Sequence, residues 1–106
     1  MDRRKALYEA FRHKAIDPDV TFLVLNAQDA LDLIRRGVSD GLLLAGVEGF
    51  NITDDGGYQP RQEFSNDYVD WNGTRAEFVS QTEQLIEKGG RVGIRFEVVF
   101  EAEQTH

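Results

Sequence analysis

The feature that most constrains the fold is the alternation of side chains over residues 91–103. Successive side chains of a β-strand point to opposite faces of its sheet, so a strand here would be apolar on one face and largely polar on the other. The apolar set is Val92, Ile94, Phe96, Val98, Phe100 and Ala102, and the opposite set is Gly93, Arg95, Glu97, Val99, Glu101 and Glu103. This pattern predicts a sheet with its core on one face and solvent on the other.

Three helices are expected to cover that core. Each has apolar side chains at helical spacing and residues typical of helix ends. The predicted helices cover residues 3–15, followed by Asp17-Pro18 and basic on the outer face; residues 26–36, capped by Asn26 and ended by Gly37; and the segment from the capping box of Thr74 and Glu77 to Gly89-Gly90.

Three further strands are predicted from apolar runs and turn residues. Thr21–Leu25 is a continuous apolar run, which is typical of a central strand buried on both faces. Leu42–Thr53 is expected to be the next strand. The turn sequence of residues 54–57 should then lead to a short edge strand, Tyr58–Arg61, while residues 62–73 are expected to form a loop or a single helical turn.

In chain order these elements predict an α+β domain, with an N-terminal helix followed by β-α-β-β-α-β, the ferredoxin-like or split βαβ two-layer sandwich. A chain of 106 residues has the size of one domain, and no linker composition divides residues 1–106. Charge separates a basic helix, residues 1–16 with five basic and two acidic side chains, from an acidic body, residues 17–106 with seven basic and seventeen acidic ones.

The composition argues against several classes of function. The net charge of −7 and the pI near 4.7 have the wrong sign for a nucleic-acid partner. The apolar runs are far shorter than the roughly 20 residues of a membrane span, and no signal peptide is recognised, so we expect a cytoplasmic protein without membrane binding. The absence of cysteine rules out disulfides, zinc–thiolate sites and iron–sulfur clusters.

No arrangement of residues typical of catalysis is found. His13 and His106 have no evident carboxylate or serine partner for general-base chemistry. Asp54 and Asp55 lie in a turn sequence that lacks the acidic spacing of a calcium loop, and no glycine-rich phosphate-binding motif is present. We therefore predict no catalytic residues, no metal site and no cofactor.

Glu48 is the one acidic residue whose neighbours predict partial burial. It lies in a mainly apolar strand between Gly46 and Gly49, which should bulge or bend that strand. A carboxylate buried in this way is a candidate for a ligand-binding or catalytic pocket. The alternative is an ion pair with Arg61 or Arg95.

The segment from Phe50 to Trp71 has the features of a recognition surface. Five of the eleven aromatic residues lie there, and residues 40–72 carry seven acidic side chains against Arg61 alone. Tyrosine and tryptophan are common anchors of protein interfaces, and carboxylates steer a basic partner. The predicted partner-binding residues are Asp54, Asp55, Tyr58, Asp67, Tyr68, Asp70 and Trp71. The alternative is that the aromatic rings of this segment fill the core.

The size, the charge, the lack of cysteine and the stretch Asp54–Trp71 resemble those of small acidic bacterial immunity or inhibitor proteins, which block a basic toxin enzyme. Gly46–Phe50 and Phe64-Ser65 are also similar to stretches of uncharacterised bacterial proteins. The resemblance implies a non-enzymatic domain that binds a basic protein. Two alternatives stay open: a homodimer formed through an exposed sheet face or residues 91–103, and a small-molecule-binding domain with a carboxylate pocket around Glu48.

Overall fold

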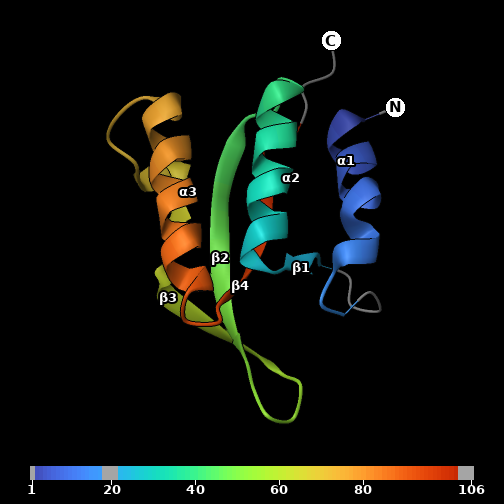
Figure 1. Cartoon of the computed structure of the whole chain (residues 1–106). Coiled ribbons are helices and arrows are strands. Elements are labelled where there is room, and N and C mark those ends of the chain that lie inside the picture. Colours follow the sequence, from blue (N-terminus) through green and yellow to red (C-terminus); the bar gives the residue numbers. More distant parts are fainter. Residues whose placement is uncertain (1, 18–21, 103–106) are drawn as a thin grey trace.

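In the computed structural model, helices lie along one side of a four-stranded antiparallel sheet (Figure 1). The structure describes residues 2–17 and 22–102. The elements are α1 (Arg3–Phe11), η1 (Arg12–Lys14), β1 (Val24–Leu25), α2 (Ala27–Ser39), β2 (Leu44–Ile52), β3 (Tyr58–Asp67), η2 (Tyr68–Asp70), α3 (Arg75–Gly90) and β4 (Arg95–Phe100). None of the described helices is long and apolar enough to cross a membrane. The predicted α+β class is confirmed.

The strand order of the sheet is β1-β4-β2-β3, and all neighbouring strands are antiparallel. β4 therefore lies between the parallel strands β1 and β2, and β2 lies between the parallel strands β3 and β4. The crossovers through α2 and α3 each join two strands that a third strand separates, which is a split βαβ connection. The predicted order of elements is confirmed, but the ferredoxin-like topology is not shown, because β1 lies at the edge of the sheet.

The main core lies between the sheet and the helices α2 and α3. From β4, Phe96, Val98 and Phe100 point into it, as the alternation predicts. The completely buried side chains that α2 and α3 contribute include Leu33, Ile34, Phe78 and Ile86. The prediction is wrong for Val92, which is 66% exposed because it lies in the turn before β4 begins, and for Ala102, which is exposed beyond the end of β4.

Helix α2 is longer than the sequence predicts. The Asn26 side chain accepts a backbone N–H at the start of the helix, as expected of a cap. The helix does not end at Gly37 but continues to Ser39, and the left-handed glycine is Gly41, with φ 86°. A Cβ at Gly37 would lie 2.2 Å from Cζ of Phe100. The missing side chain thus lets the ring of β4 approach α2.

Strand β1 differs from its predicted role. It covers only Val24–Leu25 and pairs with β4 alone, so it is an edge strand rather than a central one, and Thr21 lies outside the described residues. Beyond β1, helix α1 covers the edge of β4. The Tyr8 hydroxyl accepts the N–H of Phe100 at 3.0 Å, and Arg4 donates to the Phe100 carbonyl at 3.1 Å. Flanked on both sides, β4 does not offer the free edge that pairing with a second copy requires.

Strands β2 and β3 form the predicted hairpin, with β3 at the edge of the sheet. β3 is longer than predicted, because residues 62–67 continue it instead of forming a loop. Register shifts within β2 confirm the irregularity expected from Gly46 and Gly49. Ser65 bridges one of these shifts: its Oγ accepts the N–H of Gly49 and donates to the carbonyl of Arg61.

The two remaining helices follow the sequence signals closely. At the start of α3, the Thr74 Oγ accepts the N–H of Glu77, which confirms the predicted cap, and Glu77 reaches back to the Thr74 hydroxyl rather than to the Thr74 backbone N–H. The helix predicted over residues 3–15 is α1 followed by the short turn η1. Asp2, which the sequence reading did not single out, caps α1.

Candidate functional site

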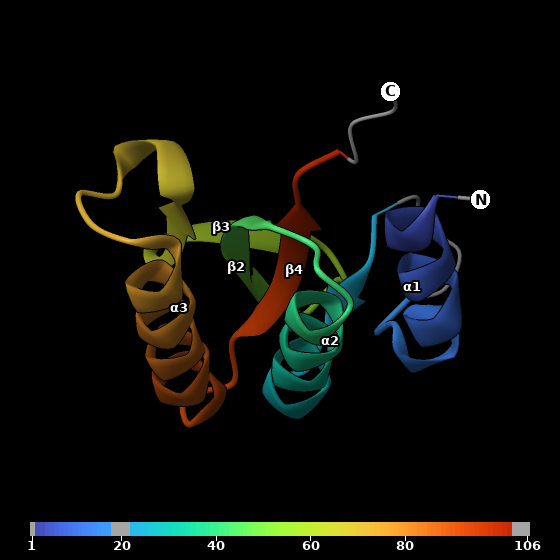
Figure 2. The ribbon, with the colours of Figure 1, turned by 90° about the horizontal axis from the view of Figure 1, so that it is seen from above.

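The candidate site is the face of the sheet that points away from the helices, here called the open face. Figure 2 shows α2 and α3 beneath the sheet and α1 beside it; of the described helices, only the short turn η2 rises above the sheet, at the end of β3. On β4 the open-face residues alternate with the core residues and are Arg95, Glu97 and Val99. Their cross-strand neighbours on β2 are Phe50, Glu48 and Gly46. The open face thus runs from an aromatic end, through carboxylates, to an apolar end.

Two glutamates face each other at the centre of the open face. Glu48 and Glu97 are direct cross-strand partners, which places their Cβ atoms about 5 Å apart. Burial first, and then the charge of Glu48, raise the pKa of Glu97. Within the described residues neither carboxylate forms an ion pair, so the expected pairing of Glu48 with Arg61 or Arg95 is wrong. Arg61 pairs with Glu63 instead.

An aromatic cluster, formed by Phe22, Phe50 and Tyr58, lies at one end of the open face. The ring centroids are between 5.5 and 6.2 Å apart. Phe50 is buried even though it points away from the helices, because the other two rings pack on it. The rings of Phe22 and Tyr58 keep part of their surface exposed. Rings of this kind are frequent energetic anchors of protein interfaces.

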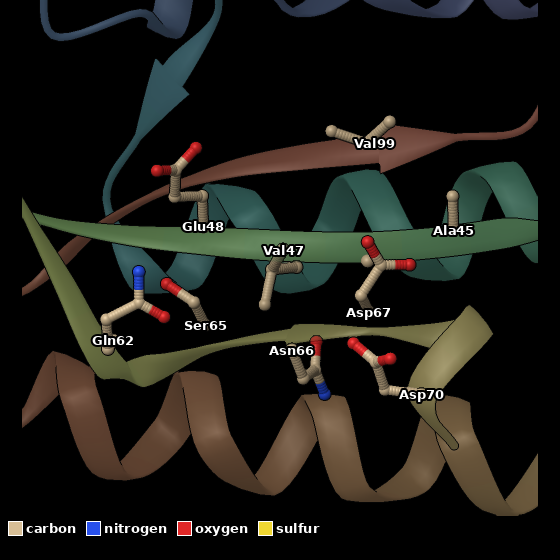
Figure 3. A pocket seen from close by; sticks show the side chains of 10 residues that line it. Ala45, Val47, Glu48, Gln62, Ser65, Asn66, Asp67, Asp70 and Val99 are labelled. Atoms are coloured by element: carbon tan, nitrogen blue, oxygen red, sulfur yellow. The ribbon is translucent and has the colours of Figure 1, made fainter.

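A pocket of about 400 Å³ lies on the open face beside Glu48, one member of the glutamate pair (Figure 3). It lies where β3 departs from the regular register with β2. Its acidic side chains are Glu48, Asp67 and Asp70, so the structure brings the predicted pocket residue together with two of the predicted partner-binding residues. The other lining residues are Ala45, Gly46, Val47, Gln62, Ser65, Asn66 and Val99.

The predicted partner-binding residues fall into two separate groups. One group lies at each end of β3. This strand has ten residues at about 3.3 Å each, so the two groups are up to roughly 30 Å apart. The group at the hairpin tip is Asp54, Asp55 and Tyr58, and the group at the other end of β3 is Asp67, Tyr68, Asp70 and Trp71. The seven residues therefore do not form one continuous surface.

At the hairpin tip, Asp55 stabilises the turn itself. Its carboxylate accepts the hydroxyl of Thr53 and the N–H of Gly57, and these bonds lower the pKa of Asp55. Gly56 supplies the positive φ of 84° that the turn requires. Asp54 is exposed beside it. The turn is consequently explained by local contacts and needs no ligand.

At the other end of β3, the aromatic side chains contribute to the fold. Tyr68 and Trp71 both pack edge-on against Phe78, with ring centroids 5.4 and 5.9 Å from it. The Trp71 Nε1 donates to the Thr74 carbonyl, and the Arg75 guanidinium lies 3.6 Å from the centre of the Tyr68 ring. These contacts support the alternative in which the rings of this segment fill the core, and they leave less of each ring for a partner.

The described parts of the chain contain no group of three or more His, Cys, Asp or Glu side chains placed to hold a metal ion. His13 is exposed in η1, and His106 lies outside the described residues. The glutamate pair and the pocket beside it are therefore the densest gathering of ionisable groups on the open face.

A comparison with models of known protein families finds no match, and no curated protein matches the sequence. The open face is therefore interpreted from its own geometry and charge.

Proposed function

We propose that the chain is a non-enzymatic protein-binding domain whose open face docks on a basic partner protein, as an immunity-type inhibitor docks on its target. The observation that carries this proposal is a sheet face that no described α-helix covers and that combines apolar side chains with carboxylates. Val99 and Ile52 remain 41% and 37% exposed on it. An apolar patch bordered by charged groups is typical of protein interaction sites.

The charge of the open face selects the kind of partner. Glu48, Glu97 and Arg95 lie on it, and the carboxylates of Asp67 and Asp70 lie beside it, so negative charge predominates. Arg75, next to this group, already pairs with Glu101 and donates to a backbone carbonyl. The net charge of −7 extends the attraction of a basic protein to longer range.

The test compares two variants that add the same positive charge in different places. Val99→Arg places it on the open face, and Val92→Arg places it on an exposed turn outside that face. Wild type and both variants serve as baits in a lysate of the source cells at low and high salt. Bound proteins are identified by mass spectrometry, and the main one is purified for calorimetry.

We expect one near-stoichiometric protein of high pI, released by salt, to bind wild type and Val92→Arg alike. Val99→Arg should weaken its binding by about tenfold or more, because the new charge repels a basic partner and its side chain disturbs the contact. Equal binding by all three baits would place the interface elsewhere. Capture of an acidic protein, or of none, would overturn the proposal.

The pocket beside Glu48 favours a second candidate function, the binding of a small molecule. Its volume of about 400 Å³ lies within the usual range of ligand sites. A thermal-shift screen of small amines and guanidines tests this candidate. Stabilisation of the wild type that Asp67→Asn abolishes would support it, and a screen without stabilisation would remove it.

A further inference from the structure

The open face also indicates what the partner presents to it, an inference that rests on the proposed function. We infer that the partner places an arginine side chain across Glu48 and Glu97 and an apolar side chain on the adjacent aromatic cluster. Arginine is the basic side chain that can donate to two carboxylates at once and stack on an aromatic ring. The inference rests on the spacing, the charge and the surroundings of the glutamate pair.

In the isolated domain, the negative charges of Glu48 and Glu97 repel each other. Like charges directly opposite each other on neighbouring strands destabilise a sheet. Neither carboxylate forms an ion pair within the described residues, and Glu97 is half buried. A cation that bridges Glu48 and Glu97 would remove this repulsion at the moment of binding. Because this repulsion is relieved only in the complex, its removal adds to the free energy of binding.

The other elements around Glu97 do not supply that cation. From β1, Val24 is its register partner, and from α1, Arg4, Tyr8 and Arg12 line a hollow of about 270 Å³ together with Glu97. The Tyr8 hydroxyl is engaged by a backbone N–H of β4. The pKa of Glu97 is raised, by burial and by the charge of Glu48, despite the arginines of α1. Arg95, two positions away on the same face of β4, donates to the Gly93 carbonyl, and no ion pair joins Glu97 to any of these arginines within the described residues. An outside cation can therefore still pair with Glu97.

The aromatic cluster lies at a distance that fits an extended segment of a partner. Phe50 is the next open-face residue after Glu48 on β2, two positions along the strand and about 7 Å away. An extended segment separates alternate side chains by the same distance. A partner segment with arginine and an apolar residue two positions apart would therefore reach both the pair and the cluster. Two copies of this domain would instead oppose glutamates to glutamates.

The experiment uses the basic protein that the wild-type bait captures as its probe. Glu48→Gln and Glu97→Gln remove one charge each with almost no change in shape, and Glu87→Gln removes the same charge from an exposed position on α3. Dissociation constants are measured at about pH 5 and pH 7.5 in low salt, a range above the ordinary pKa of glutamate. Circular dichroism confirms that each variant is folded.

We expect each variant of the pair to weaken binding by about tenfold or more at pH 7.5, with Glu87→Gln within about twofold of wild type. Wild-type binding should tighten from pH 5 to pH 7.5, because the raised pKa of Glu97 means that this side chain gains its negative charge at a higher pH than an ordinary glutamate. The affinity of Glu97→Gln should therefore depend less on pH than that of wild type. The effect of Arg→Lys changes in the partner then identifies the bridging arginine.

Two results would overturn the inference. If the pair met an apolar surface, both glutamine variants would bind more tightly and wild-type affinity would rise as the pH falls. If both variants behaved like Glu87→Gln, the arginine would lie elsewhere on the interface. In either case a loss of binding in Val99→Arg would still support docking on the open face, so failure of the inference is distinguishable from failure of the proposed function.

Discussion

Gly37 shows that a glycine's role depends on what packs against it. It follows two arginines at the end of an apolar helical pattern, which is the sequence context of a helix end. In the structure the helix continues, and the ring of Phe100 lies where a side chain would be. A helix end and a close contact with a neighbouring ring both require glycine, and only the tertiary structure shows which of the two applies at Gly37.

Gly37→Ala should destabilise the domain. The new Cβ would lie 2.2 Å from Cζ of Phe100, so the ring or the helix must shift. Such overpacking costs about 1–3 kcal/mol, against about 1 kcal/mol gained from the helix propensity of alanine. Urea unfolding measures the change, and in a Phe100→Leu background the same substitution should cost less. An alanine variant as stable as wild type would show that the contact is not restrictive.

Glu97→Gln should stabilise the domain at neutral pH by a few tenths to about 1 kcal/mol, because it removes one of two facing charges. The pKa of Glu97 is higher in the folded state than in the unfolded state, so above about pH 4.5 the folded state binds more protons. The stability of the domain therefore falls as the pH rises through the raised pKa. Urea unfolding at several pH values should show that the variant loses this decline. Glu87→Gln should keep it, and coinciding profiles of Glu97→Gln and wild type would contradict the assignment.

At the scale of elements, the local signals of the sequence are reliable and the strand partners are not. The caps Asn26 and Thr74 act on residues within three positions, so the chain itself determines them. The burial of Phe96 and Phe100 likewise follows from alternation within one strand. Whether β1 is central, and how far β3 extends, depends on which strands lie beside them. The pairing of strands depends on residues far apart in sequence, so the local pattern of a single strand does not reveal it.

Strand β1 is too short to cover the whole edge of β4, and helix α1 covers the part near Phe100. The hydroxyl oxygen of Tyr8 tests this role. Tyr8→Phe leaves the N–H of Phe100 without its acceptor, which should cost about 1–3 kcal/mol of stability. Tyr58→Phe removes a hydroxyl without a hydrogen bond among the described contacts and should cost less than about 0.5 kcal/mol. Hydrogen exchange of the Phe100 amide should accelerate in Tyr8→Phe alone. Unchanged exchange there would mean that the helix does not protect the strand edge.

At the scale of the whole molecule, the candidate site was predictable in part. Glu48 is marked by its place in an apolar strand, and Asp67 and Asp70 by local acidity, and the structure brings these three together at one pocket. Glu97 is placed on the polar face by alternation, but its pairing with Glu48 depends on the register between β2 and β4. Register across a sheet is a tertiary property, which is why the pair could not be found from the sequence.

The domain should be a monomer at neutral pH and low salt. Stacking two open faces about a two-fold axis would bring like charges together, and β4 is flanked on both sides in the described part of the chain. Light scattering over a wide concentration range should give a constant mass near 12.0 kDa. A stable mass of twice that value would instead favour self-association.

The central position of β4 also determines when the sheet can form during synthesis. β1 joins the sheet only through β4, and β4 leaves the ribosome after every other described element. Until then only the helices and the hairpin of β2 and β3 can form. The last step brings together distant residues, such as Val24 with Glu97 and Leu44 with Phe100, which is characteristic of slow folding. Completion of the sheet thus follows the synthesis of every other described element, and the strand edge that α1 covers becomes available only after that helix has left the ribosome.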